Sequence, residues 1–278
     1  MDKKIRIEFN KNYERKEEKM KTIFLTKKTL ALICFLLVLV ITLGIFGISK
    51  GAVATIAQSR LLPIYCVDSE KKCVALTFDA AWGNEDTQDL IDTLGKYKAK
   101  ATFFLVGSWV DKYPESVKAL SDAGHSIQNH SNTHPNLPQL SEEGMKQEIN
   151  LCNEKIAKIT KKTPTLIRPP YGDYSNSLIE CVNSLGMYTI QWDVDSLDWK
   201  DLSADEIYNR VVNNVKNGSI VLFHNAALNT PEALGKILEK LSSEGYKFVT
   251  VENLIYKSGY SIDHTGKQFL CETLTTEK

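Results

Sequence analysis

The chain has 278 residues, of which 43% are hydrophobic and 24% are charged. This is the composition of an ordinary globular protein, and it excludes collagen-like, coiled-coil and disordered classes. Basic and acidic side chains number 34 each, but residues 1–28 carry ten basic and five acidic ones, leaving 24 and 29 for residues 29–278. A net charge of about −5 in the larger part argues against a nucleic-acid-binding protein.

Residues 29–49 form an uncharged apolar run of 21 residues, long enough to cross a bilayer core of roughly 30 Å as a helix. Two lysines precede the run, so the positive-inside rule keeps residues 1–28 in the cytoplasm. A cleaved signal peptide is the alternative, because Ala52-Val-Ala54 offers a small-residue site. We favour an uncleaved single-pass anchor in the cell membrane, since the run exceeds the usual signal-peptide core of about 7–15 residues and Lys50 interrupts it before that site.

Five of the six cysteines lie outside the apolar run, an odd number that cannot all pair within one chain. Cys66 and Cys73 bracket a six-residue turn, and both a local disulfide and two reduced thiols in neighbouring strands fit this spacing. No C-x-x-C motif occurs, which argues against a thiolate zinc site or a redox centre.

Residues 50–71 resemble a stalk followed by a lead-in strand, and from Cys73 onward short apolar runs alternate with helical patterns. Helices are predicted between Pro114 and Gly124, over 141–160, after the capping box of Ser203 and Glu206, and from Thr230-Pro231 to Gly245. The seven predicted strands are Cys73–Phe78, Ala101–Val106, Ser126–Gln128, Leu166–Arg168, Tyr188–Trp192, Ser219–Phe223 and Phe248–Val251. This rhythm predicts an α/β fold with a parallel sheet, and the strand count suits a (β/α) barrel.

Polar side chains follow five of the predicted strands. In parallel α/β proteins the working groups collect at the carboxyl ends of strands. Here these positions hold Asp79, then His130 and His134, then Arg168, then Asp193, Asp195 and Asp198, and finally His224. We therefore expect one site at this edge of the sheet.

His130 and His134 are four residues apart, a spacing that brings two imidazoles onto one side of a helical turn and allows them to share a divalent metal. Two ordinary histidines in a polar loop are the alternative. Asp79 leaves an apolar strand directly, so it is a candidate general base, and a helix N-cap is the competing interpretation.

Arg168 is followed by two prolines, which suits a fixed guanidinium that holds a carboxylate, although a purely structural ion pair also fits. His224 ends a fully apolar strand and is the best candidate for a general acid, with a core histidine as the alternative. Asp198 can orient such an imidazole and raise its pKa.

Five motifs, TFDAAWG, NHSNTH, RPPYG, DSLDW and VLFHN, occur in this order over residues 77–225. They resemble the five motifs of the polysaccharide deacetylases, the carbohydrate esterase family 4 or NodB homology domain. The resemblance covers residues 72–253 and leaves 254–278 as a C-terminal tail. With its anchor, the chain resembles the sporulation-associated membrane branch of that family. The resemblance implies a distorted (β/α) barrel with fewer than eight strands and metal-dependent removal of N-acetyl groups from cell-wall amino sugars.

The resemblance also implies roles for individual residues. Asp79 matches the catalytic base, Arg168 the residue that orients it, His224 the general acid, and Asp198 the aspartate that tunes that acid. His130 and His134 match metal ligands, for Zn²⁺ first and Co²⁺ or Mn²⁺ as alternatives. Trp199 and Leu222 match groove residues that receive the acetyl methyl group, and the Tyr171 N–H matches a donor to the oxyanion.

The chain departs from the family at one position. The first motif of the family reads T-F-D-D, and its second Asp, the third metal ligand, is Ala80 here. Losing a charged oxygen ligand weakens metal binding, although Asn84, Glu85 and Asp86 lie nearby in sequence. The sequence predicts a membrane-anchored polysaccharide deacetylase, and the alternative is a catalytically weak or silent protein that binds cell-wall glycan on the same fold.

Overall fold

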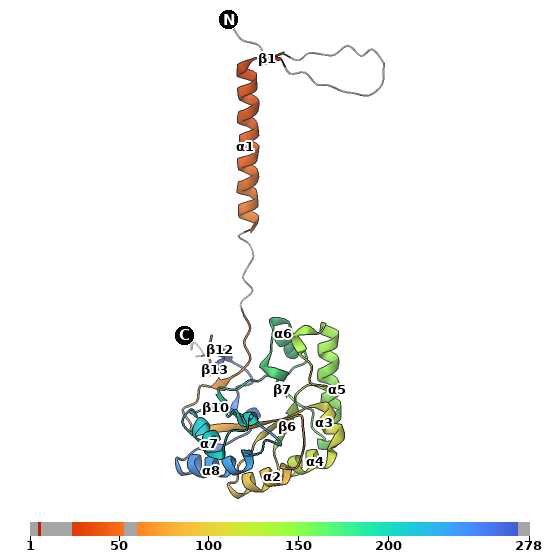
Figure 1. The fold of residues 1–278 in the computed structure, drawn as a ribbon, viewed down its shortest axis with the longest axis vertical. Coiled ribbons are helices and arrows are strands. Elements are labelled where there is room, and N and C mark those ends of the chain that lie inside the picture. Colours follow the sequence, from red (N-terminus) through yellow and green to blue (C-terminus); the bar gives the residue numbers. More distant parts are fainter. Residues whose placement is uncertain (1–4, 7–23, 53–59, 272–278) are drawn as a thin grey trace, which may run out of the picture. The chain divides into compact units, whose positions relative to one another are not determined.

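The computed structural model describes residues 5–6, 24–52 and 60–271. It divides into two compact units, residues 1–59 and 60–278. In the first unit, α1 (Lys27–Ala52) is a single helix, and the short strands β1 (Ile5–Arg6) and β2 (Phe24–Leu25) pair antiparallel (Figure 1).

The predicted transmembrane helix of residues 29–49 falls within α1. Among the helices of the described residues, none meets the combination of length and apolarity that crossing a membrane requires. The span is therefore unconfirmed. Most of the basic segment 1–28, and Ala54 of the alternative cleavage site, lie outside the described residues.

The second unit is built on an eleven-stranded sheet in the order β12-β13-β3-β10-β4-β5-β6-β7-β8, with β11 beside β4 and β9 beside β10. The strands from β10 through β4 to β8 all pair in parallel. The strands are β3 (Cys66–Val67), β4 (Cys73–Ala80), β5 (Thr102–Leu105), β6 (Ser126–Asn129), β7 (Leu166–Ile167), β8 (Tyr188–Thr189), β9 (Val194–Asp195), β10 (Ser219–His224), β11 (Lys247–Phe248), β12 (Tyr260–Ile262) and β13 (Lys267–Leu270).

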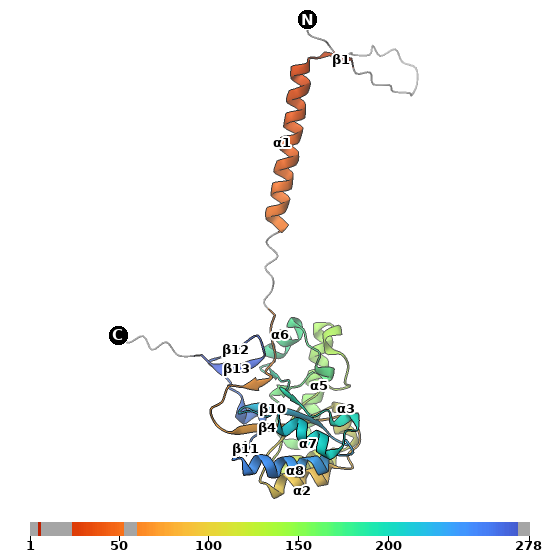
Figure 2. The same cartoon turned by 60° about the vertical axis from the view of Figure 1, so that its left-hand side comes forward.

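Helices connect these strands and cover the sheet (Figures 1 and 2). They are α2 (Thr87–Lys96), α3 (Gly107–Lys112), α4 (Pro114–Asp122), α5 (Glu142–Thr160), α6 (Asn176–Ser184), α7 (Ala204–Val212), α8 (Thr230–Ser243) and α9 (Val251–Leu254), with 3₁₀ turns at Leu137–Gln139, Pro170–Gly172 and Asp198–Lys200. The predicted helix starts are confirmed at Pro114 and at the capping box of Ser203 and Glu206. The structure caps α8 with Asn229, one residue before the predicted Thr230.

The central strand β4 separates two parts of the core by the alternation of its side chains. Leu76, Phe78 and Ala80 pack in the cluster that contains the residues of α2, α7 and α8, whereas Ala75 belongs to a second cluster with Phe104 and Ile190. Asp79 shares the parity of Ala75 and therefore leaves the strand on the side away from these helices.

The sheet curls into an incomplete barrel. Its lead-in residue Ile64 forms an isolated parallel bridge with Ile190, just beyond β8. The bridge is made by two backbone hydrogen bonds, from Ile64 N–H to the Thr189 carbonyl and from Gln191 N–H to the Ile64 carbonyl. The predicted α/β class and parallel sheet are confirmed.

Two segments differ from the sequence prediction. Residues Tyr260–Leu270, predicted as part of a tail, form the hairpin β12–β13, and β13 pairs with β3. The predicted strand Phe248–Val251 ends at Phe248, because Val251 begins α9.

Of the two alternatives for Cys66 and Cys73, the structure has the reduced pair, since both residues are free thiols. Burial raises the pKa of Cys66 to about 11.

Candidate active site

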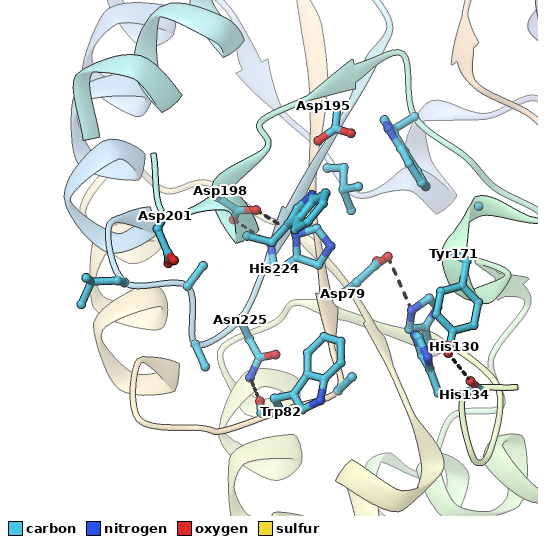
Figure 3. Close-up of a pocket in the computed structure, with 18 residues that line it drawn as sticks. Asp79, Trp82, His130, His134, Tyr171, Asp195, Asp198, Asp201, His224 and Asn225 are labelled. Carbon is cyan, nitrogen blue, oxygen red and sulfur yellow. Dashed lines mark hydrogen bonds and ion pairs between the residues drawn. The ribbon is translucent and has the colours of Figure 1, made fainter. Parts of the chain in front are cut away.

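The carboxyl ends of the parallel strands surround a pocket of about 750 Å³ (Figure 3). Eight of the nine predicted site residues line it: Asp79, His130, His134, Tyr171, Asp198, Trp199, Leu222 and His224. The ninth, Arg168, is completely buried. The expectation that the residues at the ends of several strands meet at one site is therefore confirmed.

Asp79 and His224 are neighbours because they are register partners on β4 and β10, the two paired strands at the centre of the sheet. Both side chains enter the pocket. The N-cap interpretation of Asp79 is wrong, since α2 begins at Thr87 and its N-cap is Asp86.

The Asp79 carboxylate is held by a charged hydrogen bond. Arg168 Nη1 donates to Asp79 Oδ1 at 2.7 Å, and His130 Nε2 lies 3.6 Å from Asp79 Oδ2. Burial alone raises the pKa of Asp79, but the Arg168 charge, which is the largest opposing effect, and the Arg168 hydrogen bond act against burial, and the pKa lies below its usual value. Asp79 is therefore ionised at neutral pH.

The Arg168 guanidinium is held by two aromatic rings and by hydrogen bonds from both of its terminal nitrogens, while its buried Nε has no hydrogen-bond partner among the described residues. It lies over the rings of Phe104 and Trp192, at 4.3 and 5.4 Å from their centroids. Nη2 donates to the Gln191 carbonyl at 3.0 Å. A buried guanidinium held in this way presents one N–H to Asp79 in a single orientation.

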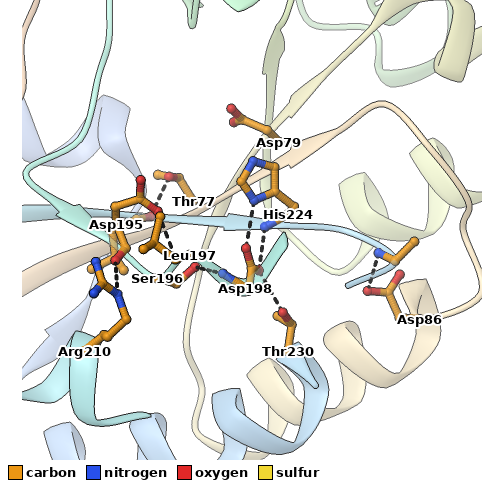
Figure 4. Close-up of polar contacts among 12 residues, drawn as sticks. Thr77, Asp79, Asp86, Asp195, Ser196, Leu197, Asp198, Arg210, His224 and Thr230 are labelled. Carbon is orange, nitrogen blue, oxygen red and sulfur yellow. Dashed lines mark hydrogen bonds and ion pairs between the residues drawn. The ribbon is translucent and has the colours of Figure 1, made fainter. Parts of the chain in front are cut away.

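His224 is hydrogen-bonded to a different carboxylate, that of Asp198 (Figure 4). Its Nδ1 lies 2.8 Å from Asp198 Oδ1, and its backbone N–H donates to Asp198 Oδ2. Thr230 Oγ1 donates to the same Oδ2. Burial lowers the pKa of His224, but the hydrogen bond and charge of Asp198 outweigh burial and raise that pKa above its usual value. Because the carboxylate accepts from Nδ1, Nε2 is the nitrogen left for the pocket.

His130 and His134 are brought together, with ring centroids 4.9 Å apart. The helical turn predicted between them is wrong: Ser131 and His134 have φ values of 66° and 63°, in the left-handed region. Asn129 Oδ1 accepts the Ser131 N–H and Ser131 Oγ accepts the His134 N–H, so side chains rather than a helix shape this loop.

Both imidazoles have a lowered pKa, which favours the neutral form that can bind a metal. Burial lowers the pKa of His130, and burial together with the charge of His130 lowers the pKa of His134 to about 4. His130 Nδ1 lies 2.6 Å from the Arg168 carbonyl oxygen. A carbonyl only accepts, so Nδ1 carries the proton and Nε2 offers a lone pair toward the pocket.

The number of donors is insufficient for a metal site. Over residues 60–271, no three His, Cys, Asp or Glu side chains are grouped as a metal would require. Ala80 is buried in the helix-facing core, and neither Glu85 nor Asp86 lines the pocket. Glu85 accepts from Asn84 N–H, and Asp86 accepts from Ala226 N–H. The residues present do not complete a protein site for a divalent metal, and we derive no catalytic step through one.

Two further acidic residues, Asp193 and Asp195, lie just before Asp198 and make different contacts. Asp193 accepts from Ser219 Oγ and Ile220 N–H and so ties this segment to β10. Asp195 lines the pocket beside Asp198 and caps its own turn by accepting the Leu197 N–H.

Sequence reasoning missed several lining residues, among them Trp82, Asn225, Asp201 and Leu228. Trp82 and Asn225 lie inside two of the five motifs, TFDAAWG and VLFHN. Their position next to chemically active residues was the available signal.

Residues 67–190 match the family model described as Polysaccharide deacetylase. The chain is 39% identical to the peptidoglycan-N-acetylmuramic acid deacetylase PdaC of Bacillus subtilis over 188 residues, which are 68% of this chain and 40% of PdaC. It is 36% identical to a peptidoglycan-N-acetylglucosamine deacetylase of Bacillus cereus over 189 residues, covering 66% of this chain and 69% of that relative.

A solved structure adds a different kind of relative. Wild-type BA3943 of Bacillus anthracis, described as a CE4 family pseudoenzyme, superposes with a TM-score of 0.68 at 35% identity, covering 70% of this chain and 69% of that one. A mutant of BA3943 is described as having restored enzymatic activity. Together with the pocket geometry, these matches show that the chain belongs to the polysaccharide deacetylase family.

Proposed function

We propose that this chain hydrolyses the N-acetyl groups of amino sugars in cell-wall glycan of the peptidoglycan type. One observation carries the proposal: a carboxylate and an imidazole face one pocket from register-matched positions, Asp79 on β4 and His224 on β10. Arg168 holds the pKa of the carboxylate below its usual value, and Asp198 raises the pKa of the imidazole. Hydrolysis of an amide needs this pair, a base for water and an acid for the amine that leaves.

The residues divide the reaction between them. Asp79 accepts a proton from the water that attacks the acetyl carbonyl carbon, while Arg168 holds the carboxylate in place. The Tyr171 backbone N–H stabilises the oxyanion that forms on the carbonyl oxygen. His224 Nε2 then protonates the sugar nitrogen as the carbon–nitrogen bond breaks, which releases acetate and a free amine. Leu222 and Trp199, both at the pocket wall, contact the acetyl methyl group.

The substrate class follows from the relatives. PdaC is named for N-acetylmuramic acid and the Bacillus cereus relative for N-acetylglucosamine, both as units of peptidoglycan. The proposal covers amino sugars of this type without choosing between them.

We further propose that residues 29–49 anchor the chain in the cell membrane as a single pass, with residues 60–271 outside the cytoplasm. The support is the uncharged run with two lysines before it. From Leu30 to Ile41, the large apolar side chains of α1 are exposed, and apolar surface of this extent marks a membrane or protein contact.

A second candidate is a glycan-binding protein that does not turn its ligand over. It is favoured by Ala80, by the incomplete set of metal donors, and by the likeness to the pseudoenzyme BA3943. The pocket and its aromatic residues serve a binding protein equally well.

Acetate release from purified peptidoglycan decides between the two functions. The full chain is assayed with Zn²⁺, Co²⁺ or Mn²⁺ and with a chelator. The proposal expects acetate above the level of the Asp79→Asn variant in at least one condition. Binding of peptidoglycan without acetate in any condition supports the second candidate.

A further inference from the structure

Exposed large apolar side chains gather at the pocket. In the described residues 60–271 five such side chains are exposed, namely Trp82, Tyr171, Trp199, Leu228 and Leu270. The first four line the pocket, and only Leu270 lies elsewhere. Apolar surface concentrated at a single hollow marks a place where a ligand covers it.

Among the aromatic residues of this group, the proposed reaction assigns a role to Tyr171 and Trp199 but none to Trp82. Its side chain is 65% exposed, and Figure 3 shows it between Asn225 and His134, at the edge of the pocket. The indole ring centroid lies 6.0 Å from that of His134, whose other side meets the Tyr171 ring at 4.7 Å.

The backbone that carries Trp82 is held by several hydrogen bonds, although its side chain is exposed. Trp109 Nε1 and Asn225 Nδ2 both donate to the carbonyl oxygens of Trp82 and Gly83. Gly83 has φ +43°, and a Cβ there would lie 2.7 Å from Ala226 Cβ. An exposed aromatic ring on a fixed backbone binds a ligand at little cost in conformational entropy.

The chemistry of the pocket indicates which ligand covers the ring. Carboxylates, imidazoles and an amide alternate with the exposed rings, and the lining includes no lysine or arginine. A pyranose ring matches this mixture, because its C–H face is apolar while its hydroxyls are donors. Indole combines a large apolar face with a polar N–H and suits such a partner.

We propose that Trp82 is a stacking platform for a pyranose ring of the glycan that enters this pocket. The inference rests on the proposed function only in taking the ligand to be a glycan, and it holds whether or not the chain turns that glycan over. Trp82 is thus a binding residue that sets affinity and orientation beside Asp79 and His224.

Binding without turnover tests the inference. The full chain with Asp79→Asn is titrated calorimetrically with the tetramer of β-1,4-linked N-acetylglucosamine, an uncharged probe. Trp82→Ala in this background is expected to weaken binding about tenfold, the loss of one aromatic contact and its buried apolar area. Trp82→Tyr, which keeps an aromatic face, is expected to stay within about threefold.

Leu270→Ala is the matched control, since it removes an exposed apolar side chain outside this pocket and should leave the affinity unchanged. Circular dichroism of each variant confirms the fold, and the series is repeated in the His224→Ala background if Asp79→Asn does not fold. Unchanged affinity of Trp82→Ala, or no binding of the tetramer in either background, overturns the inference. Trp82-dependent binding by a parent chain that releases no acetate refutes the deacetylase function alone.

Discussion

Asp79 and Ala80 are adjacent in sequence, but their side chains lie on opposite faces of strand β4. Asp79 lines the pocket, whereas Ala80 is 1% exposed and packs with Leu76 and Phe78 in the helix-facing cluster. The chain therefore keeps its candidate base and lacks a carboxylate at the neighbouring position. In the family that the five motifs resemble, this neighbouring position holds the third metal ligand.

Replacing Ala80 with Asp tests the donor count. We predict that Ala80→Asp raises the affinity for Zn²⁺ about tenfold or more, since an anionic oxygen joins two neutral imidazoles. Calorimetric titration of the ion into the parent chain, Ala80→Asp and Ala80→Asp with His130→Ala measures the effect. The third protein should lose the gain.

Because Ala80 is buried, Ala80→Asp has a second possible result that would contradict this prediction. A carboxylate that stays in the apolar cluster without a partner costs stability and binds no ion. A lower melting temperature combined with an unchanged Zn²⁺ affinity would show that position 80 belongs to the core and not to the site.

In the proposed reaction, Asp198 sets the alkaline limit of activity. His224 can protonate the leaving amine only while it is itself protonated, so turnover should fall as the pH rises through its pKa, which Asp198 raises above the usual value. Asp79 and Asp195 also face this imidazole and raise its pKa, but less strongly than Asp198. In Asp198→Asn the effect of burial is no longer outweighed by that carboxylate, so the pKa of His224 falls.

We predict that the alkaline limb of kcat/KM against pH moves to lower pH in Asp198→Asn. The exposed pocket residue Asp201, changed to Asn, is the control and should move the limb much less. An alkaline limb at the same pH in Asp198→Asn and in the parent chain is incompatible with His224 as the acid.

At the scale of elements, α5 fixes the histidine loop. Glu148 accepts two backbone N–H groups, those of Asn132 and Thr133, with Oε2, and it accepts the Thr133 hydroxyl with Oε1. One carboxylate thus satisfies three donors between His130 and His134. Charged acceptors form stronger hydrogen bonds than neutral ones.

We predict that Glu148→Gln lowers the free energy of unfolding by about 1–3 kcal/mol, because a neutral amide oxygen accepts the two N–H groups more weakly than the carboxylate does, and the NH₂ end cannot accept from the Thr133 hydroxyl. Urea denaturation measures the change. Glu142→Gln on the same helix removes an exposed pair with Lys146 and one of two acidic charges in the first turn, and it should cost less than about 1 kcal/mol. Equal losses in the two variants would show that Glu148 has no special role in the loop.

The strands differ in how well their bounds could be predicted from the sequence. Strands β4, β5 and β10 are long apolar runs, and each lies within two residues of its prediction. Two short elements were missed or misplaced: β9, of two residues, was not predicted, and Phe248–Val251 is an apolar run divided between β11 and α9. The short strands β6 and β7 lie within one residue of their predictions. The hairpin of β12 and β13 is polar and half-buried, so its sequence has no alternation strong enough to mark it.

The candidate site was more predictable than its exact geometry. Strand ends placed Asp79 and His224 correctly, because the edge of a parallel sheet collects residues from distant parts of the chain. The bend between His130 and His134 depends on left-handed residues and on Glu148 from α5, which a spacing of four residues cannot reveal. Trp82 was missed because an exposed tryptophan in a motif looks the same as a buried one.

For the whole molecule, the proposed anchor makes a topological prediction. Protease added to intact protoplasts should digest residues 60–271 and leave the segment 1–28 protected, since that segment lies in the cytoplasm if residues 29–49 span the membrane. Immunoblotting with tags at both ends follows the two parts. Protection of the C-terminal tag with loss of the N-terminal one would contradict this orientation. Assignment to the sporulation-associated branch stays a prediction from the resemblance of the anchor.

The central claim is that Asp79 and His224 together remove acetyl groups from peptidoglycan. Its most direct test is acetate released per mole of full-length chain for the parent, Asp79→Asn and His224→Ala, each shown to be folded by circular dichroism. We predict release by the parent and a loss of roughly 10²-fold or more in each variant, the usual size of a general acid or base contribution. Release of acetate by both folded variants at the parental rate, or no release by the parent with any divalent metal, would contradict the account.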